Sequence, residues 1–341
     1  MCDIMKPIAT FAARSLDDNI LSSSTSGGVF VALANVILSQ KGVVVGAAWA
    51  KDMMSVVHKC VETEADIGSL QGSKYTQSSL ANVISDIDVA LSQERMVLFT
   101  GIPCQIAAMH KRYMDAPNLI LCAVICHSNS PPEFWRKYAG ELQTLKNDRI
   151  KNVRFRDKRH GWRNSYLSIE FQRDERNNIF EPLGESPYIQ AYFEGYISKD
   201  ACLKCQFKGG RCNADIIIGD FWGIEDCCKR FDDGKGVSVV FAYSAKGLAL
   251  LESADLDKEN VEYRKAIVKN PYHENSISPN MQRRARFLKA YVRSDFRKAI
   301  MYANREKLSI RIVYVLVRIW NRFKGCFANM IVKSKNRDHL Q

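Results

Sequence analysis

The sequence has no segment of the kind that directs a protein out of the cytoplasm or across a membrane. Its N-terminus lacks a basic stretch followed by an apolar one, and no apolar run of about 18 residues occurs in the chain. No internal repeat is visible. Apolar residues make up 46% of the 341 residues and charged residues 25%, which excludes wholesale disorder. We therefore expect a cytoplasmic globular protein, long enough for two domains or one elaborated domain.

Acidic residues are scarce in one region only, the C-terminal tail. Residues 281–337 hold 16 Lys and Arg but only 2 Asp and Glu, so their net charge is +14, the remainder is −2 and the whole chain is +12. A near-neutral body with a basic tail argues against a general polyanion-binding surface and for one local contact region. We predict no nucleic-acid partner.

The basic tail is expected to form helices over residues 280–303 and from Arg305 to about Lys333. At 100° per residue, one stripe of the second helix is basic and the opposite side is apolar. The basic stripe consists of Lys307, Arg311, Arg318 and Arg322. Such a helix can lie in an anionic membrane surface, dock on a partner or pack on its own domain. The first alternative places the protein peripherally at the inner face of the membrane.

The chain has eleven cysteines, an odd number. Without an export signal this points to metal ligation or redox work, and away from a disulfide framework. Cys202 and Cys205 have the spacing at which two thiolates turn toward one metal, and Cys212 follows a glycine turn. The segment continues into a buried strand, 216–218, and a turn, 219–223, which carries two large rings. The alternative is that these are unligated core thiols, because free cysteine is often buried.

Two further cysteines follow predicted buried strands. One stretch is typical of strand, tight turn and helix, with Gly101 in the turn, Pro103 at the first helical position and Cys104 in the first turn. The helix dipole there favours a thiolate, for metal ligation or for nucleophilic attack. A second strand delivers Cys126 and His127 at its C-terminal end. In parallel α/β sheets this end is where ligands bind.

Two loops contain the small residues that let a backbone approach a phosphate. Residues 21–28 precede an apolar run, 29–38, long enough for a buried helix whose N-terminus offers free N–H groups and a positive dipole end. In the second loop, 71–75, Lys74 could reach a phosphate and Tyr75 could lie on a ring system. Each loop is also consistent with an ordinary capped helix or a solvated surface loop.

The patterns as a whole predict an α/β fold: a mixed sheet core with helices on both faces, an antiparallel β insert and a C-terminal helical tail. Helices are expected over 78–91 and 186–196. From Lys151 the composition changes to polar strands, which we interpret as the insert. These strands are predicted at 153–156, 159–162 and 166–171.

Five motifs in collinear order, from Ser22 to Glu225, resemble the coenzyme F420 hydrogenase/dehydrogenase β-subunit family. They are the Ser-rich loop, Gly72-Ser-Lys-Tyr75, Thr100-Gly-Ile-Pro-Cys-Gln105, Cys126-His127, and Cys202-x-x-Cys205 with the strand and Gly-Asp-Phe-Trp-Gly turn behind it. The resemblance implies an iron–sulfur flavoprotein oxidoreductase that passes electrons between a [4Fe-4S] cluster, FAD and a deazaflavin-like or other organic substrate.

The resemblance also implies the site residues and the domains. The flavin nucleotide would be held by Ser24, Ser26, Gly27, Gly28, Gly72, Ser73, Lys74, Tyr75, Thr100 and Gly101. The cluster ligands would be Cys104, Cys126, Cys202 and Cys205. Residues 1–150 would form the flavin-binding half, 151–280 the half with the cysteine knuckle, and 281–341 the basic tail.

The chain departs from the family pattern in places. Only Cys2 and Cys60 precede Cys104, so the N-terminal ferredoxin module of many relatives is expected to be missing and a separate ferredoxin-like donor to supply electrons. Ile102 replaces a small hydroxyl residue and Ser128 replaces a glycine, which leaves deazaflavin specificity open. Shortened relatives with basic tails are associated with bacterial surface-polysaccharide genes, where the small-molecule substrate could be a sugar or a lipid-linked intermediate.

Two other classes of function remain open at this point. The cysteines could hold structural zinc in a binding or scaffold protein, although cysteines on separate strand ends suit a zinc ribbon poorly. Alternatively, Cys104 or Cys126 could be the nucleophile of a transferase without a cluster. Adjacent strand residues point to opposite faces, which argues against Cys126 and His127 as a nucleophile–base pair.

Overall fold

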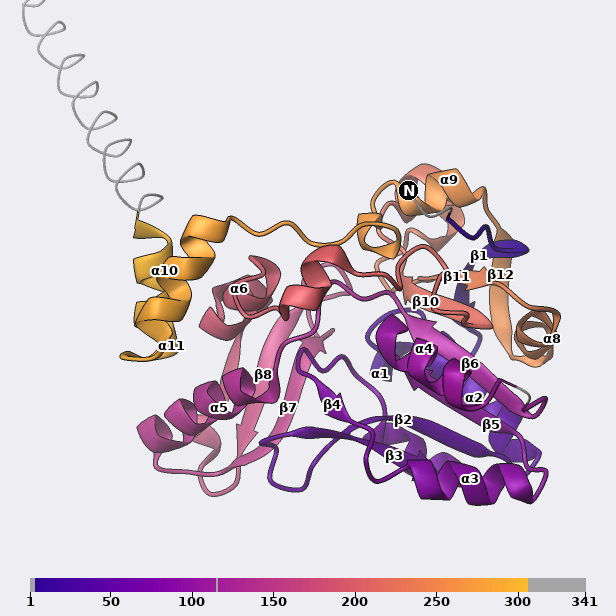
Figure 1. Cartoon of the computed structure of the whole chain (residues 1–341), viewed down its shortest axis with the longest axis horizontal. Coiled ribbons are helices and arrows are strands. Elements are labelled where there is room, and N and C mark those ends of the chain that lie inside the picture. Colours follow the sequence, from indigo (N-terminus) through magenta and orange to yellow (C-terminus); the bar gives the residue numbers. More distant parts are fainter. Residues whose placement is uncertain (1–3, 115, 306–341) are drawn as a thin grey trace, which may run out of the picture. The chain divides into compact units, whose positions relative to one another are not determined.

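The computed structural model describes residues 4–114 and 116–305. The chain divides after Pro279 into two compact units. The first unit is built on a nine-stranded mixed sheet with the strand order β12-β1-β11-β10-β6-β5-β2-β3-β4 (Figure 1). A second, three-stranded antiparallel sheet has the order β7-β8-β9. The predicted α/β class, with a mixed sheet core and an antiparallel insert, is confirmed.

The elements have the following bounds. The strands are β1 (Ala9–Ser15), β2 (Val43–Trp49), β3 (Val56–Val61), β4 (Ser78–Ser79), β5 (Val97–Gly101), β6 (Leu119–Val124), β7 (Ile150–Asp157), β8 (Tyr166–Phe171), β9 (Ile179–Pro182), β10 (Ile216–Asp220), β11 (Ser238–Ala242) and β12 (Leu256–Asn260). The α-helices are α1 (Asp18–Ser23), α2 (Val29–Ser39), α3 (Ile84–Ser92), α4 (Pro103–Arg112), α5 (Pro132–Lys146), α6 (Pro187–Phe193), α7 (Ile224–Cys227), α8 (Ala245–Ser253), α9 (Tyr263–Ile267), α10 (Met281–Tyr291) and α11 (Phe296–Ala303).

The centre of the large sheet is parallel. Strands β2, β5, β6 and β10 run side by side in the same direction, and they carry the uninterrupted apolar runs expected of strands buried on both faces. Antiparallel strands flank them on both sides. Because parallel strands end at the same edge, the residues that follow β5, β6 and β10 meet there.

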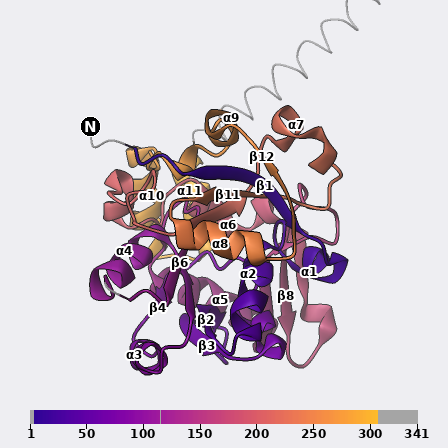
Figure 2. The ribbon, with the colours of Figure 1, turned by 90° about the vertical axis from the view of Figure 1, so that its right-hand side faces the viewer.

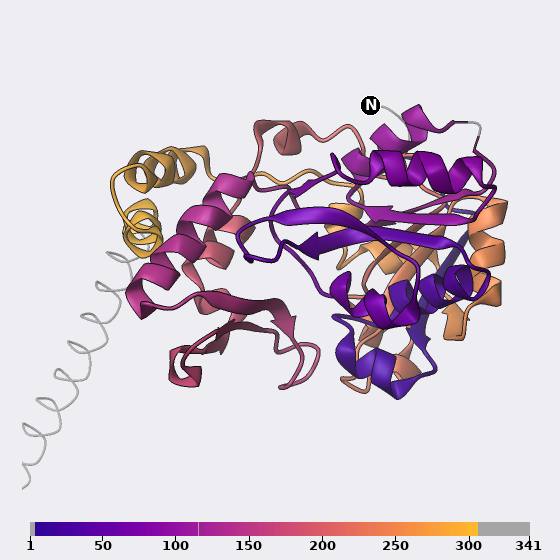
Figure 3. The same cartoon turned by 90° about the horizontal axis from the view of Figure 1, so that it is seen from below.

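Two apolar clusters cover the two faces of the sheet. Buried residues of α2 and α8, such as Leu33 and Leu251, pack on one face. Residues of α3, α4 and α7, such as Ile87, Ile106 and Ile224, pack on the other. Figure 2 places α2 beside α8, and Figure 3 shows the strands between the purple helices and the indigo ones. The predicted helices on both faces are therefore confirmed.

The antiparallel insert differs from its prediction in one strand. Strands β7 and β8 lie where they were expected, but residues 159–162 belong to the loop between them. The third strand is β9, which pairs with β8. The prediction at 159–162 was wrong because Trp162 is not buried within the small sheet. Its indole N–H donates a hydrogen bond to Asp220 of β10, in the large sheet.

Two predicted helices are shorter than expected. The helix predicted over 78–91 begins only at Ile84, since Ser78 and Ser79 pair with β3 as the short strand β4. The helix predicted over 186–196 is α6, which ends at Phe193. Both predictions erred at a helix end, which the residue pattern does not fix.

The second unit is described by itself. The single helix predicted over 280–303 is two helices, α10 and α11, since the chain turns at Val292 and Asp295 caps the second helix by accepting a hydrogen bond from the Lys298 N–H at 2.8 Å. The rings of Phe287, Tyr291 and Phe296 hold the pair together. The helix predicted from Arg305 to Lys333, with its basic stripe, lies outside the described residues. Among the residues described, no helix is long and apolar enough to span a membrane.

Candidate active site

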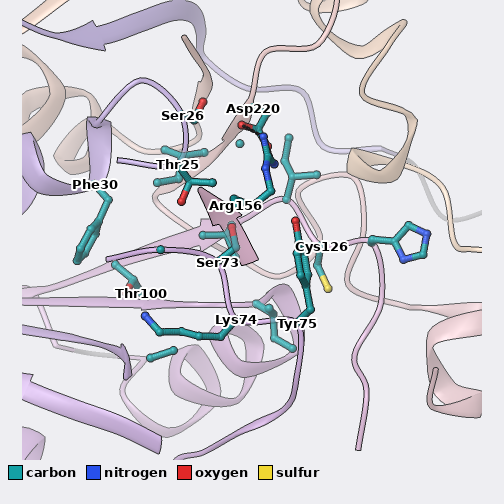
Figure 4. Close-up of a pocket in the computed structure, with 18 of the residues that line it drawn as sticks. Thr25, Ser26, Phe30, Ser73, Lys74, Tyr75, Thr100, Cys126, Arg156 and Asp220 are labelled. Carbon is teal, nitrogen blue, oxygen red and sulfur yellow. Dashed lines mark hydrogen bonds and ion pairs between the residues drawn. The ribbon is translucent and has the colours of Figure 1, made fainter. Parts of the chain in front are cut away.

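A cavity of about 620 Å³ lies where β5, β6 and β10 end, within the range of cofactor pockets (Figure 4). Its walls come from the loop before α2, the loop at 71–78, the ends of the three strands and β7 of the insert. All of the residues predicted to hold the nucleotide line it, with the exception of Gly27. The topology thus gathers these six segments around one space.

The Ser-rich loop reaches the cavity at the start of α2. Gly28 is the N-cap of that helix and has a φ of +78°, a left-handed conformation that favours glycine. Gly27 lies behind the wall, where an added Cβ would stand 2.5 Å from the Ala13 carbonyl oxygen. The Ser26 hydroxyl donates to the Val237 carbonyl at 2.8 Å. The Ser24 hydroxyl, which is buried in the cavity wall, has no hydrogen-bond partner.

Lys74 lies on the opposite side of the cavity in Figure 4, near Thr100. Its amine donates to the carbonyls of Leu70 at 3.0 Å and Gln71 at 2.7 Å. Burial nevertheless lowers its pKa from 10.5 to about 7. The Thr100 hydroxyl donates to the Val45 carbonyl at 2.9 Å, so toward the cavity it offers only oxygen lone pairs.

Tyr75 supplies an aromatic wall. Its ring lies 4.8 Å from that of Tyr192 and 5.3 Å from that of Phe155, measured between centroids. Its backbone carbonyl accepts a hydrogen bond from the Tyr188 hydroxyl at 2.8 Å. Burial raises the pKa of the Tyr75 phenol, and Arg156, which hydrogen-bonds to it, partly opposes that rise. The phenol is therefore protonated and rigidly held at neutral pH.

The structure adds cavity residues that were not predicted. Arg156 of β7 forms an ion pair with Asp220 at the end of β10, with 2.5 Å between Nη1 and Oδ2. The Trp162 indole donates to the same carboxylate at 3.0 Å and stacks on Trp222 at a centroid distance of 4.9 Å. The Gly-Asp-Phe-Trp-Gly turn was recognised as rigid, but its partner Arg156 gives no sequence signal, because it is one of several polar residues in an alternating strand.

The four predicted ligand cysteines come from three places in the fold. Cys104 lies in the first turn of α4, as predicted, with Pro103 at its start. Cys126 follows β6 and lines the cavity. Cys202 and Cys205 lie at a 3₁₀ turn over residues 200–204. All four are unpaired thiols, and all four are partly exposed.

The four thiols lie close enough to affect one another's pKa values. The pKa of Cys126 is raised to about 12, chiefly by burial; Lys208 lowers it, and Cys104, Cys202 and Cys205 make smaller contributions that raise it. Burial also raises the pKa of Cys104, with Cys205 and Cys202 adding to it, and this outweighs the N–H groups of the helix start that lower it. The N–H groups of the helix start do lower the pKa of Cys104, as expected, but burial and, to a smaller extent, the neighbouring thiols raise it by more.

One cation lies among the cysteines. Lys208 is buried, with 3% of its surface exposed, and its amine donates to the Cys126 carbonyl and, at 2.7 Å, to the Tyr272 carbonyl. Burial lowers its pKa, whereas all four cysteines raise it. Nearby, the Asn129 N–H donates to the Cys202 sulfur at 3.4 Å. A charged centre with several thiolates is thus already provided with a counter-ion and an amide donor.

The described residues form no site for a single metal ion. Within the described part of the chain, no three His, Cys, Asp or Glu side chains are grouped closely enough to hold a single metal ion. In an iron–sulfur cubane each thiolate binds a different iron atom, so the protein sulfurs stand farther apart than around one ion. A cluster on the four predicted thiols would therefore need a wider spacing of sulfurs than a single-ion site.

The other cysteines near this site belong to the core. Cys212 and Cys122 are fully buried in apolar clusters. Burial raises the pKa of Cys212 to about 11, and Cys205 and Cys104 of the predicted ligand set also raise it, but Cys212 lines no part of the cavity. His127, considered as a base for Cys126, packs against Tyr272 at 4.4 Å and shares a hydrogen bond with Ser128, and burial lowers its pKa to about 4. The Cys126 thiol itself donates to the Ser128 carbonyl.

Comparison with known proteins identifies the family. A sequence model for the C-terminal part of the coenzyme F420 hydrogenase/dehydrogenase beta subunit matches residues 94–267, and the model for the N-terminal part of the same subunit matches residues 10–85. No curated protein matches the chain. Among solved structures, a chain of the F420-reducing [NiFe] hydrogenase complex from Methanosarcina barkeri, in a xenon-derivatised form, is 17% identical. The match covers 84% of this chain and 94% of that one with a TM-score of 0.53, a likeness that establishes the fold. The chain therefore belongs to the coenzyme F420 hydrogenase/dehydrogenase β-subunit family and is an oxidoreductase.

Proposed function

We propose that the protein passes electrons between a [4Fe-4S] cluster, an FAD and a small organic substrate. The observation that carries the proposal is the position of Cys126. This residue lines the large cavity and is also electrostatically coupled to Cys104, Cys202 and Cys205. A cluster on these four thiolates would therefore adjoin whatever ring system the cavity binds, which is the arrangement that electron transfer between them requires.

The cysteine site has the features needed to hold the cluster. Burial and, to a smaller extent, the three other thiols disfavour a free thiolate at Cys126, and iron would supply the compensating charge. The Lys208 ammonium and the Asn129 N–H would stabilise negative charge on sulfur, which favours the reduced cluster. When bound, the cluster and the flavin together supply the conversion between single-electron and two-electron chemistry.

The cavity has the features needed to hold a flavin nucleotide. Ser24 and Thr76 each present a buried hydroxyl that has no partner in the protein. Orphaned buried polar groups are costly, and a ligand that bonds to them removes that cost. The loop before α2 offers helical N–H groups, Lys74 offers an amine, and Tyr75 offers an aromatic face. We assign FAD to this space on the basis of these groups and of the family.

The substrate would enter at the aromatic mouth of the cavity. Phe193, Trp222 and Tyr272 line the cavity and keep 46%, 37% and 38% of their surfaces exposed. Planar rings pack well on such side chains, which suits a deazaflavin-like or other organic substrate. The family resemblance suggests an association of shortened relatives with surface-polysaccharide genes, and on that basis we extend the proposed substrates to intermediates of such a pathway.

The electrons would come from a separate ferredoxin-like protein. The partly exposed knuckle of Cys202 and Cys205 gives a donor a short route to the cluster. Structural similarity to a chain of a multi-subunit hydrogenase complex is consistent with partner subunits. Cytoplasmic placement, contact of the tail helix with an anionic membrane, and the division into 1–150, 151–280 and 281–341 stay predictions. Equal flotation with anionic liposomes before and after truncation at residue 304 would contradict the membrane contact.

Single substitutions test the proposed function. We expect Cys202→Ser to lose iron and to lose reductase activity toward an artificial dye in the same preparation. Cys227→Ser, which changes a cysteine outside the cluster site, should keep both. Iron is measured per chain and activity with a reduced ferredoxin as donor. Intact iron in the Cys202 variant, or activity that survives the loss of iron, would contradict the assignment.

A further inference from the structure

Three of the four predicted cluster ligands are accessible from outside the cavity. Cys126 lines the cavity, whereas Cys104, Cys202 and Cys205 are not among the residues of its wall. All three are nevertheless partly exposed. A protein that approaches from this side would therefore come close to the thiols without competing with a ligand in the cavity.

The surface segment 199–211, which carries the two cysteines of the knuckle, is basic. Its accessible charged side chains are three cations and one carboxylate, a net charge of +2. They are Lys199, Lys204, Arg211 and Asp200. The buried Lys208 adds a further positive charge beneath this surface. The approach to the thiols thus favours a negatively charged partner.

These cations are not neutralised by ion pairs. Elsewhere in the first unit, an exposed arginine such as Arg163 is bound by two carboxylates. Among residues 4–114 and 116–305, no carboxylate forms an ion pair with Lys199, Lys204 or Arg211. The Arg211 Nε donates instead to the Gln206 carbonyl at 3.0 Å, which leaves its positive charge uncompensated. The three charges are therefore available to a partner.

Residues 4–6 extend this surface. The Met5 N–H donates to the Gly209 carbonyl at 3.0 Å, so this segment lies along the knuckle. Lys6 is exposed and adds a cation. Ile4 and Met5 each keep 44% of their surface exposed, and they add apolar area beside the charges. We call residues 4–6 and 199–211 together the knuckle face.

An acidic one-electron carrier matches the knuckle face in charge and in position. Complementary charge speeds the encounter of two proteins and orients them, and apolar contacts within the charged rim add affinity. The cations surround the predicted cluster ligands, which favours a redox partner over other polyanions. In each encounter the carrier would lose one electron and be oxidised, and this protein would gain that electron and be reduced.

We propose that the knuckle face is the docking surface for an acidic, ferredoxin-like electron donor, and that Lys204 and Arg211 recognise its negative charge. The inference rests on the proposed function, which places a redox centre on the exposed thiols. To that function it adds the place of docking and the sign of the partner's charge.

The test uses the full chain and an acidic plant-type [2Fe-2S] ferredoxin as the probe. The main variant is the double change Lys204→Glu with Arg211→Glu. Lys51→Glu with Lys59→Glu is the matched control, since both lysines are exposed and lie outside the knuckle face. The rate at which each protein oxidises reduced ferredoxin is followed anaerobically by stopped flow. Reduced methyl viologen, a small cationic donor, replaces the ferredoxin in a parallel series.

A footprint locates the bound ferredoxin without any turnover. Lysines of the wild type are acetylated with and without oxidised ferredoxin, and each site is quantified by mass spectrometry. We expect ferredoxin to protect Lys6 and Lys204 and to leave Lys51 unprotected. This measurement does not depend on the iron content of the chain.

We expect the double variant to react with ferredoxin roughly 10- to 100-fold more slowly than the wild type at low ionic strength, because electrostatic steering is lost. The difference should shrink as salt is added, since salt screens exposed charges. The rate with methyl viologen should stay within about twofold of the wild type, as for other surface substitutions. The control variant should match the wild type with both donors.

Three results would overturn the inference while leaving the proposed function intact. The first is an unchanged ferredoxin rate in the double variant. The second is an equal slowing with both donors, which would assign the two residues to the structure of the thiol site. The third is a footprint without protection at Lys6 and Lys204, for example one confined to the basic tail. A wild type that contains no iron and accepts electrons from neither donor would overturn the proposed function, and this inference with it.

Discussion

Lys74 makes the stability of the flavin-free protein depend on pH in a direction that can be worked out. Burial lowers the pKa of its amine from 10.5 to about 7. Below pH 7 the amine is charged in both the folded and the unfolded protein, and the folded state bears the whole cost of burying the charge. As pH rises from 7 toward 10.5 the folded state releases the proton first, and this cost disappears.

The expected change is large enough to measure. Within this window each pH unit adds about 1.4 kcal/mol to the free energy of unfolding, or ~3 kcal/mol between pH 7 and pH 9.5. Lys74→Met removes the titrating group. It also leaves the Leu70 and Gln71 carbonyls without their donor, at a cost of about 1 kcal/mol each that does not vary with pH.

The measurement is urea unfolding of wild type and Lys74→Met at pH 6.5, 8 and 9.5, with reductant present. When the free energy of unfolding of one protein is subtracted from that of the other at each pH, the contributions of all other titrating groups cancel. The free energy of unfolding of the wild type should rise relative to that of Lys74→Met as pH increases. For Lys51→Met, a change at an exposed position, it should vary with pH as in the wild type. A difference between wild type and Lys74→Met that is constant from pH 7 to 9.5 would refute the argument, because the amine would then be hydrated in the folded protein.

Three further predictions concern the cavity wall and its supports. Gly27→Ala places a Cβ 2.5 Å from a backbone carbonyl and should weaken FAD binding at least tenfold in a fluorescence titration, whereas Gly184→Ala, in open space, should not. Gln105→Ala removes the side chain that caps α4 at Ile102 and should cost about 1 kcal/mol, with faster loss of iron to a chelator; unchanged iron release would argue against this role. Burial lowers the pKa of His58 to about 4, so the unfolded state takes up its proton first and stability should fall from pH 6.5 toward pH 4. His58→Gln should flatten that fall in urea unfolding, and an unchanged slope would contradict it.

The strand ends around the cavity were predictable because their signals are local. Apolar runs followed by Gly101 or by Cys126 mark buried strands and their ends, and Pro103 marks the start of a helix. Parallel strands then bring these ends to one edge, whichever order they take in the sheet. The same reasoning placed the Ser-rich loop before α2, since a left-handed Gly28 fits the helix start.

Other parts of the fold and site could not be read from local patterns. Strand β1 is rich in alanine, which has little preference for strands, and it was not predicted. The pairing of Arg156 with Asp220 joins positions 64 residues apart across two sheets. Lys208 lies among the cysteines, but from the sequence it would be predicted to be a surface lysine in a glycine-rich turn. The Arg156–Asp220 pair and the position of Lys208 depend on how distant segments pack, and local sequence patterns do not predict that packing.

The most direct test of the account is an anaerobic visible spectrum of the purified full chain, with iron, acid-labile sulfide and flavin measured on the same sample. The account predicts about four iron and four sulfide per chain, flavin absorption bands, and loss of the iron in Cys126→Ser. A protein that holds zinc or no metal, and no flavin, even after anaerobic reconstitution with iron, sulfide and FAD, would contradict it.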